Sequence, residues 1–250
     1  MNSMHSNGRN VFITGASGGI GKALVNSFSH KGYNIWACIR RKNEIFEKYC
    51  EDLSEECGVW IRVVYADLSI SESRRNCIKD AIQEEKSLDV LINCAGIGHM
   101  GLFQMTSSES IKEIYEVNVF AVMDLCQYAV RIMSKQKRGI IINISSTASN
   151  ETYVGNCIYG ATKASVNAFT KSLAAEVATL GIQVNAIAPG LTDTEMSRVF
   201  EGNDKLLPLE RSAIGRKLLP SEIADVAVTL CDDSMKMVNG QVIVVNGGSK

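Results

Sequence analysis

The sequence predicts an α/β fold, in which a doubly wound sheet of seven parallel strands is flanked by helices within one domain over residues 1–250. Two observations predict it. Short runs rich in β-branched residues alternate with longer amphipathic stretches, as they do where helices connect parallel strands. The short runs are also almost unbroken in apolar character, as in Ile140-Ile141-Ile142, which indicates strands buried on both faces. Ligands of such sheets bind at the carboxyl ends of the strands.

The elements follow in order along the chain. The expected strands are residues 10–14, 34–39, 59–66, 90–93, 139–145, 182–187 and 241–246. Apolar residues at helical spacing predict the helices between them, most clearly residues 20–31, 72–85, 108–134, 159–180 and 221–231. The alternation is interrupted at residues 192–219. A connection of this length in a compact domain is typical of a functional lid, and we expect it to cover the substrate.

The composition disfavours several kinds of partner and site. The formal net charge is -1, and the longest basic cluster is Arg40-Arg41-Lys42, so we expect no nucleic-acid or anionic-membrane surface. The eight cysteines are dispersed and there are only three histidines, which favours reduced thiols and no metal site. The polar start of the chain and the lack of a long apolar run predict a cytoplasmic protein without a membrane span.

A glycine-rich loop connects the first strand to the first helix. Thr14 ends the strand, and Gly15, Gly19 and Gly21 precede the apolar periodicity of the helix. Glycines let a backbone approach a pyrophosphate closely, and the N-terminus of the helix offers free N–H groups to it. The spacing differs from the common Gly-x-Gly-x-x-Gly pattern. A dinucleotide site is therefore favoured over a simple tight turn by the order of strand, loop and helix.

The end of the second strand bears on the choice of nucleotide. It contains Arg40 and Arg41, where enzymes that use NAD commonly carry an acid for the ribose hydroxyls. Guanidinium groups bind phosphate as charged forks, so NADP(H) is favoured over NAD(H), the alternative being a solvated basic loop. Asp67, which ends the third strand, could contact the adenine amino group or cap the helix before Ser71.

A tyrosine and a lysine four residues apart are the candidates for proton transfer. Tyr159 and Lys163 share one face of a predicted helix. The neighbouring ammonium is expected to lower the pKa of the phenol from about 10, which would make Tyr159 a proton donor to a carbonyl oxygen. Ser146, at the end of a central strand, would point its hydroxyl into the same crevice. Alone, such a helical pair is more often a solvated surface pair.

These segments together resemble the short-chain dehydrogenase/reductase family over nearly the whole chain. The matching segments are residues 14–21, residues 93–96, Asn118, Ser146, Tyr159 with Lys163, and Pro189-Gly190 with Thr194. The resemblance implies a Rossmann-type fold and an NAD(P)-dependent oxidoreductase acting on CH–OH groups. Cys94 and Asn246 depart from the family pattern, which often has Asn and Asp at these positions.

The resemblance also implies roles for individual residues. The catalytic group would be Asn118, Ser146, Tyr159 and Lys163, with Asn118 holding a water that relays protons to Lys163. Lys163 would also bind the nicotinamide ribose, residues 93–96 would line the adenosine half, and residues 187–194 would hold the carboxamide. The implied cofactor-binding residues are Gly15, Ser17, Gly19, Ile20, Gly21, Arg40, Arg41, Asp67, Leu68, Asn93, Ala95, Gly96, Tyr159, Lys163, Pro189, Gly190, Thr192 and Thr194.

Within the family, residues 93–96, 185–190 and 239–248 are most similar to 3-oxoacyl-(acyl-carrier-protein) reductases. This similarity implies NADPH-dependent reduction of a 3-oxoacyl thioester in fatty acid biosynthesis, a homotetramer and acyl carrier protein as a candidate partner. An acidic carrier needs a basic docking surface. Lys135, Lys137 and Arg138 supply charge, but Ala175 and Leu180 stand where such reductases often have Arg.

Two alternatives remain open at this stage. One is a dehydrogenase or reductase of a small alcohol, sugar or polyol, since one fold supports many substrates. Its pocket would be shaped by His99, Met100, residues 152–154 and residues 196–209. The other is a non-catalytic NADP-binding scaffold, which the intact set of Asn118, Ser146, Tyr159 and Lys163 disfavours.

Overall fold

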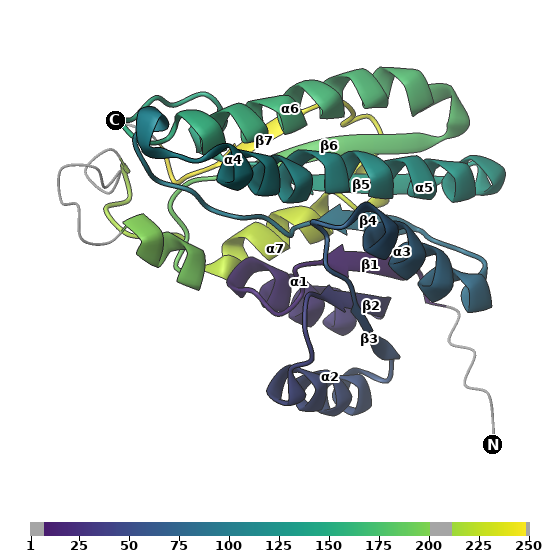
Figure 1. Ribbon diagram of the computed structural model, residues 1–250. Helices are drawn as coiled ribbons and strands as arrows, with labels where there is room; N and C mark the ends of the chain where they lie inside the picture. The colour runs from purple at the N-terminus through teal and green to yellow at the C-terminus, as the bar shows by residue number, and fades with distance from the viewer. Residues whose placement is uncertain (1–7, 201–211, 249–250) are drawn as a thin grey trace.

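The computed structural model describes residues 8–200 and 212–248. Within these residues a seven-stranded sheet has the order β3-β2-β1-β4-β5-β6-β7, and every neighbouring pair is parallel (Figure 1). The strands are β1 (Asn10–Thr14), β2 (Asn34–Ile39), β3 (Ile61–Tyr65), β4 (Val90–Asn93), β5 (Gly139–Ile144), β6 (Ile182–Pro189) and β7 (Val242–Val245). The predicted fold class is confirmed. The chain changes direction across the sheet between β1 and β4, where such folds place their ligands.

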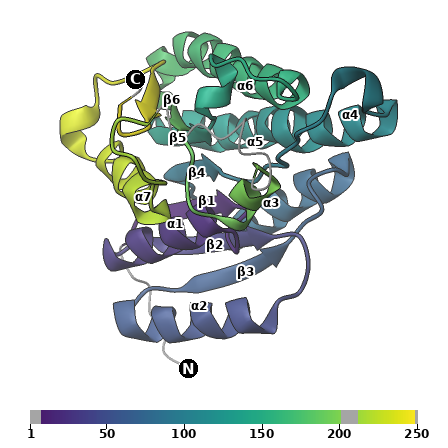
Figure 2. The ribbon, with the colours of Figure 1, turned by 90° about the vertical axis from the view of Figure 1, so that its left-hand side faces the viewer.

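Both faces of the sheet are covered by helices. In β1, Val11 and Ile13 join one apolar cluster, whereas Phe12 between them joins the other, as the alternation of side chains along a strand requires. The helices α1 (Gly19–His30), α2 (Glu44–Cys57) and α7 (Pro220–Thr229) cover the first face. On the opposite face lie α3 (Ser71–Glu85), α5 (Ala121–Gln136) and α6 (Cys157–Val177) (Figure 2). This double burial explains the unbroken apolar runs of the sequence.

Most strand and helix bounds match the expected ones within a few residues. β6 extends two residues beyond the expected end, to Pro189, because β7 pairs with its last residues. The helix α6 begins at Cys157 and is followed by a 3-10 turn at Ala178–Leu180. None of the helices in residues 8–200 and 212–248 has both the length and the apolar character to cross a bilayer.

The sequence analysis did not identify α2. Its apolar stripe is narrow, with Phe46, Cys50 and Leu53 buried and mostly charged residues between them. Two local signals mark its ends. The Asn43 side chain accepts a hydrogen bond from the Phe46 backbone N–H at 3.0 Å, and Gly58 ends the helix in the left-handed conformation. Both are common terminating residues of helices.

The single helix expected at residues 108–134 is interrupted. It comprises α4 (Ser108–Tyr115), a π-helical segment (Glu116–Phe120) and α5. A π-helical turn inserts extra backbone into a helix and is frequent at functional sites. The hydrophobic periodicity does not reveal the segment, because helical spacing continues on both sides of it without a glycine or a proline. The segment contains Asn118.

The expected lid falls only partly within the described residues. Thr192 forms an isolated parallel bridge with Leu218, and a 3-10 helix covers Glu195–Phe200. Residues 201–211, which include much of the expected lid, lie outside the described part. The segment before them contacts the glycine-rich loop, because a Cβ atom added at Gly19 would lie 2.6 Å from the Thr194 Cγ2 atom.

Candidate active site

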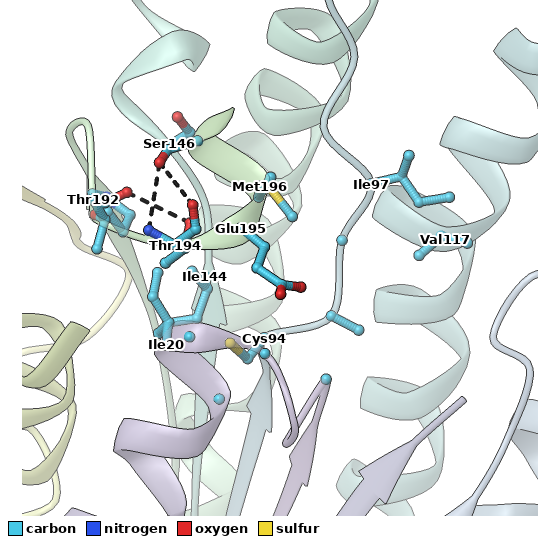
Figure 3. A pocket seen from close by; sticks show the side chains of 18 of the residues that line it. Ile20, Cys94, Ile97, Val117, Ile144, Ser146, Thr192, Thr194, Glu195 and Met196 are labelled. Carbon is cyan, nitrogen blue, oxygen red and sulfur yellow. Dashed lines mark hydrogen bonds between the residues drawn. The ribbon is translucent and has the colours of Figure 1, made fainter. Parts of the chain in front are cut away.

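A cavity of about 810 Å³ lies at the carboxyl ends of the central strands. Its volume is within the range of small-molecule and cofactor sites. Figure 3 shows Cys94, Ile144 and Ser146 on its walls, with Glu195 and Met196 extending into it from the segment after Thr194. The cavity therefore joins the glycine-rich loop, the end of β5, the start of α6 and the segment after β6 in one site.

The glycine-rich loop requires glycine at the positions that face other backbone. Gly15 has a φ of +65°, and a Cβ atom added there would lie 2.8 Å from the Ala95 Cα atom. A Cβ atom at Gly21 would overlap the Gly15 carbonyl oxygen. The first turn of α1 has no acidic residue, and Gly18 forms no side-chain cap. This loop and helix N-terminus therefore have the room and the charge to accommodate an anionic pyrophosphate, and its binding here stays a prediction.

One hydroxyl fixes the neighbouring loop against β1. Thr14 Oγ1 accepts hydrogen bonds from the backbone N–H groups of Cys94 at 3.0 Å and Ala95 at 3.1 Å. Cys94, Ala95 and Gly96 line the cavity. Asn93 is 2% exposed and is not among the lining residues. Its amide donates to the Asn143 side-chain oxygen at 2.8 Å, so Asn93 supports β4 and β5 from behind the cavity.

Arg40 pairs with Asp67 at the end of the cavity where the sequence predicts adenosine to bind, which we call the adenosine end. The Nε and Nη2 atoms of Arg40 each lie 3.0 Å from Asp67 Oδ2. Hydrogen bonds from the Ser69 hydroxyl and backbone, followed by those from Arg40, lower the pKa of Asp67. Arg40 and Asp67 both line the cavity, together with Leu68, whereas Arg41 is exposed and is not among the lining residues. Only one of the two predicted arginines is thus directed to the site.

Tyr159, Lys163 and Ser146 meet on one wall. Tyr159 is 8% and Lys163 is 5% exposed, and the Lys163 ammonium lies 5.8 Å from the centre of the Tyr159 ring. Lys163 Nζ donates to the Ile144 carbonyl at 2.9 Å, which ties α6 to the end of β5. Ser146 Oγ accepts from the Ala148 N–H at 3.2 Å, and the Ser146 hydroxyl favours a lower pKa of the Tyr159 phenol.

Burial dominates the acid–base properties of this group. It raises the pKa of Tyr159 to about 12, against the lowering effect of the Ser146 hydroxyl. It also lowers the pKa of Lys163 to about 8, although the negative charge of a Cys94 thiolate would raise it. The expectation that Lys163 lowers the tyrosine pKa was wrong here, because the cost of burying a phenolate outweighs the attraction of an ammonium directed at Ile144. At neutral pH Tyr159 therefore carries its proton.

The neighbouring serines have other partners. Ser145 Oγ donates to the Lys163 carbonyl at 3.3 Å, and Ser149 Oγ donates to the Ser146 carbonyl at 2.7 Å. Ser146 is the serine whose hydroxyl affects the pKa of Tyr159. Both Ser145 and Ser146 line the cavity, and the assignment of Ser146 as the acting serine stays a prediction.

Asn118 holds the far wall of the site together. Its Oδ1 accepts from the Ile97 N–H at 2.7 Å, and its Nδ2 donates to the Ile97 carbonyl at 3.0 Å and to Thr162 Oγ1 at 3.2 Å. The residue is 1% exposed and is not among those that line the cavity. A Cβ atom at Gly96 would lie 3.4 Å from Asn118 Oδ1 and 3.5 Å from Lys163 Nζ, so Gly96 lies next to both side chains.

Residues after β6 close the site from the opposite side. The Gly190 N–H donates to the Val245 carbonyl at 2.8 Å, and Thr192 Oγ1 donates to the Gly190 carbonyl at 3.0 Å. Thr194 Oγ1 lies 3.5 Å from the Thr192 carbonyl (Figure 3). Pro189, Gly190, Thr192 and Thr194 all line the cavity. The structure therefore brings these four predicted residues to the same site as Ser146.

Comparison with known proteins agrees with this geometry. The family model for short chain dehydrogenase matches residues 9–204. The chain belongs to the short-chain dehydrogenase family. The protein is therefore an oxidoreductase that acts on CH–OH groups, and the family assignment made from the motifs is confirmed.

Several relatives are similar to this short-chain dehydrogenase over nearly its whole length. A 3-oxoacyl-[acyl-carrier-protein] reductase of Chlamydia trachomatis is 32% identical over 242 residues, covering 96% of each chain. A Beutenbergia cavernae structure with bound NADP, provisionally named an NAD(P)-dependent gluconate 5-dehydrogenase, has a TM-score of 0.89 at 29% identity and covers 96% of each chain. Acetoin dehydrogenase of Salmonella typhimurium has a TM-score of 0.86 at 28% identity, with coverages of 96% and 95%.

Sequence reasoning missed several residues that line the cavity of this short-chain dehydrogenase. These are Asn43, Ile97, Val117 and Asn156, whereas Glu195 falls within the expected lid. Two of the missed residues are adjacent to a motif that the sequence did reveal. Ile97 follows residues 93–96, and Val117 precedes Asn118. Proximity to a motif in the chain was therefore an available signal, but it does not show which way each side chain points.

Proposed function

We propose that this short-chain dehydrogenase reduces a 3-oxoacyl thioester to the 3-hydroxyacyl thioester with NADPH. The observation that carries the proposal is that Ser146, Tyr159 and Lys163 line one cavity together with the glycine-rich loop. The choice of substrate is supported by the similarity to a 3-oxoacyl-[acyl-carrier-protein] reductase over 96% of the chain.

Tyr159 and Ser146 would act on the substrate carbonyl. A phenol with a pKa of about 12 is protonated at neutral pH, so it can donate its proton to the oxygen as that oxygen becomes an alkoxide. Ser146, which lines the same cavity, would donate a hydrogen bond from its hydroxyl group to the same oxygen. NADPH, when bound, supplies the hydride. The product is a neutral alcohol.

Lys163 and Asn118 would support Tyr159. With a pKa of about 8, Lys163 is mainly protonated at neutral pH, and its bond to the Ile144 carbonyl leaves further N–H groups for the ribose hydroxyls of a nucleotide and for a water. Asn118 would hold the backbone around that water in place through its two bonds to Ile97. The proton lost by Tyr159 would be replaced along this route.

The nucleotide would span the cavity from the adenosine end to Tyr159. The positive φ of Gly15 and the lack of space for a Cβ atom at Gly21 make a cradle for the pyrophosphate. Arg40 would bind the 2′-phosphate, exchanging its bond to Asp67 for one to the more highly charged phosphate. The NADP in the similar Beutenbergia structure also supports this nucleotide.

A second candidate is reduction of a small ketone or oxidation of a small alcohol, sugar or polyol. Two similar structures favour it, because their names refer to gluconate and acetoin. The basic surface expected for a carrier protein is also weaker than the sequence suggested. Arg138 lies 3.1 Å from Asp89, so part of its charge is neutralised within the chain. A carrier protein as partner, a homotetramer and a lid at residues 192–219 stay predictions.

The test is NADPH consumption by the purified protein at 340 nm with three substrates: a 3-oxoacyl thioester of coenzyme A, the same acyl group on acyl carrier protein, and a panel of small ketones and sugars. Reduction of either thioester at a kcat/KM well above that for the panel is expected. A higher kcat/KM for the carrier-linked form would identify the carrier as partner. Turnover with a panel member alone would instead support the second candidate.

A further inference from the structure

A buried arginine joins α3 to the segment that follows α4. Arg74 is 4% exposed and shares the buried face of α3 with Cys77, Ile78 and Ile82. A guanidinium group on an apolar helix face costs free energy unless its N–H groups are paired. Its neighbour Arg75 has 64% of its side chain exposed. The position of Arg74 therefore requires specific partners.

These partners come from two parts of the chain. Arg74 Nη1 donates to the Leu68 carbonyl at 3.1 Å and to Glu116 Oε2 at 2.7 Å. Its Nε donates to Asp124 Oδ2 at 2.6 Å. Burial favours a lower pKa for Arg74, but the hydrogen bonds to Asp124 and Glu116 outweigh it and the pKa is raised. The guanidinium is thus a permanent cation held by two carboxylates and a carbonyl.

Both ends of this network reach the cavity. Leu68 lines its adenosine end, and the preceding residue, Asp67, donates its backbone N–H to Ser73 Oγ of α3 at 3.0 Å. Glu116 is the first residue of the π-helical segment. The next residue, Val117, also lines the cavity. One nitrogen atom of Arg74 therefore contacts both the adenosine end and the π-helical segment.

We propose that Arg74 is a positioning residue that couples the adenosine end of the cavity to the π-helical segment at Glu116–Phe120. Leu68 and Glu116 both accept a hydrogen bond from Arg74 Nη1. A bound adenosine group that restricts the motion of Leu68 therefore also restricts the Arg74 nitrogen atom that binds Glu116. The coupling rests on nucleotide binding in this cavity, which is part of the proposed function. Lysine cannot replace the fork, since a single ammonium on a flexible chain cannot keep the planar, two-nitrogen arrangement toward three partners.

Hydrogen–deuterium exchange with 2′,5′-ADP tests this coupling without any substrate. This probe carries the adenosine and 2′-phosphate groups but no nicotinamide. In the unaltered protein it should slow exchange at residues 15–21 and also, by about tenfold, at residues 116–120, a coupling of ordinary size. In Arg74→Lys the slowing at 116–120 should fall below about twofold while residues 15–21 stay protected.

Two further variants make the test specific. Arg75→Lys is the matched control, because Arg75 lies on the same helix, 3.7 Å from Asp124, and does not line the cavity; it should behave like the unaltered protein. Glu116→Gln leaves Arg74 paired with Asp124, so it replaces Arg74→Lys as the test variant if Arg74→Lys does not fold. It should also lose the response at 116–120. Thermal unfolding of each variant shows whether the fold is retained.

The outcomes separate the coupling from the proposed function. Protection at 116–120 that persists in a folded Arg74→Lys or Glu116→Gln variant would overturn the coupling, as would protection confined to residues 15–21 in the unaltered protein. A probe that protects neither region would overturn nucleotide binding and the coupling together. If the coupling is found but no 3-oxoacyl thioester is reduced, the substrate proposal fails and the role of Arg74 stands.

Discussion

The two ends of the cavity are built from different parts of the chain. The glycine-loop end is formed by main chain and by buried groups, such as Gly15 against Ala95 and Thr14 Oγ1 between β1 and β4. At the other end, which we call the lid end, the side chains of Met100, Tyr153 and Met196 line the cavity. Substitutions at the glycine-loop end would disturb contacts between backbone segments. At the lid end, side chains can be replaced without moving the backbone. This difference explains how one fold keeps its cofactor chemistry while its substrates vary.

The largest expected effect lies where the two ends meet. Tyr159→Phe removes the proton donor, so kcat should fall on the order of 10³-fold, within the range for general acid catalysis. NADPH affinity should change little, since the ring and its burial are kept. Turnover with NADPH and fluorescence titration of NADPH measure the two quantities. Activity retained within tenfold would show that another group supplies the proton.

A single methyl group should disturb the glycine-loop end strongly. In Gly15→Ala the new Cβ atom would lie 2.8 Å from the Ala95 Cα atom at a φ of +65°, which should cost about 1–3 kcal/mol of stability. The NADPH dissociation constant should rise by roughly tenfold or more. Thermal unfolding and NADPH titration check both results. Gly32→Ala, also at positive φ but with nothing within 4 Å of the added atom, separates backbone strain from contact with Ala95.

Replacing Arg40 tests whether the adenosine end of the cavity, next to the glycine-rich loop, distinguishes NADPH from NADH. Arg40→Ala should raise the Kd of NADPH about tenfold, because a charged hydrogen bond contributes about 1.5–3 kcal/mol, and should leave NADH binding nearly unchanged. Arg41→Ala is the matched control, since Arg41 is exposed and outside the cavity lining. Equal losses for NADPH and NADH in Arg40→Ala would contradict a phosphate-binding role.

The pH dependence of reduction should report Lys163. Burial lowers its pKa to about 8, so the ammonium is present below that pH and is lost as the pH rises through it. The rate of reduction should therefore fall above pH 8, by about tenfold per unit for a single ionisation. Tyr159, with a pKa of about 12, stays protonated over this range. A rate that is constant up to pH 10 would show that the charge on Lys163 is not required.

The smallest effect is expected at the lid end. Met196 packs against Gly98, where an added Cβ atom would lie 2.9 Å from its Cγ atom. Met196→Ser should raise KM for a long-chain 3-oxoacyl thioester by about threefold through lost apolar contact. The effect on a short-chain thioester should be smaller and NADPH affinity should not change. If the affinity for NADPH fell by the same factor as KM rose, the lid end would affect the nucleotide as much as the substrate, and the contrast between the two ends would be wrong.

The sequence was most informative about the glycine-loop end. Glycines there are required by backbone contacts, and buried parallel strands leave unbroken apolar runs, so both the fold and the positions of Gly15 and Ser146 could be predicted. Their shared place in one cavity follows from parallel strands that all end at one edge. Family resemblance then supplied Asn118.

Features that depend on tertiary packing were less accessible. The sequence placed Asn93 in the cofactor site, but the structure directs its amide to Asn143 at 2.8 Å. The balance of burial and charge that raises the pKa of Tyr159 also cannot be read from a four-residue spacing. The sequence contains one sign of the role of Arg74, which is its position on the same helix face as the apolar residues Cys77 and Ile78. Its acidic partners, however, lie 42 and 50 residues away in the chain.

The two hydrogen bonds between Asn118 and Ile97 restrict which side chain the π-helical segment can carry at position 118. The carboxamide of Asn118 pairs with both the N–H and the C=O of one residue, as the main chain of an adjacent strand would. The Asn118 carboxamide therefore needs its acceptor opposite the Ile97 N–H and its donor opposite the Ile97 carbonyl. Aspartate has almost the same shape but no donor, so it would place two oxygen atoms side by side where Nδ2 now meets the Ile97 carbonyl. Replacing one NH₂ group by oxygen would therefore reverse an attraction without changing the volume of the side chain.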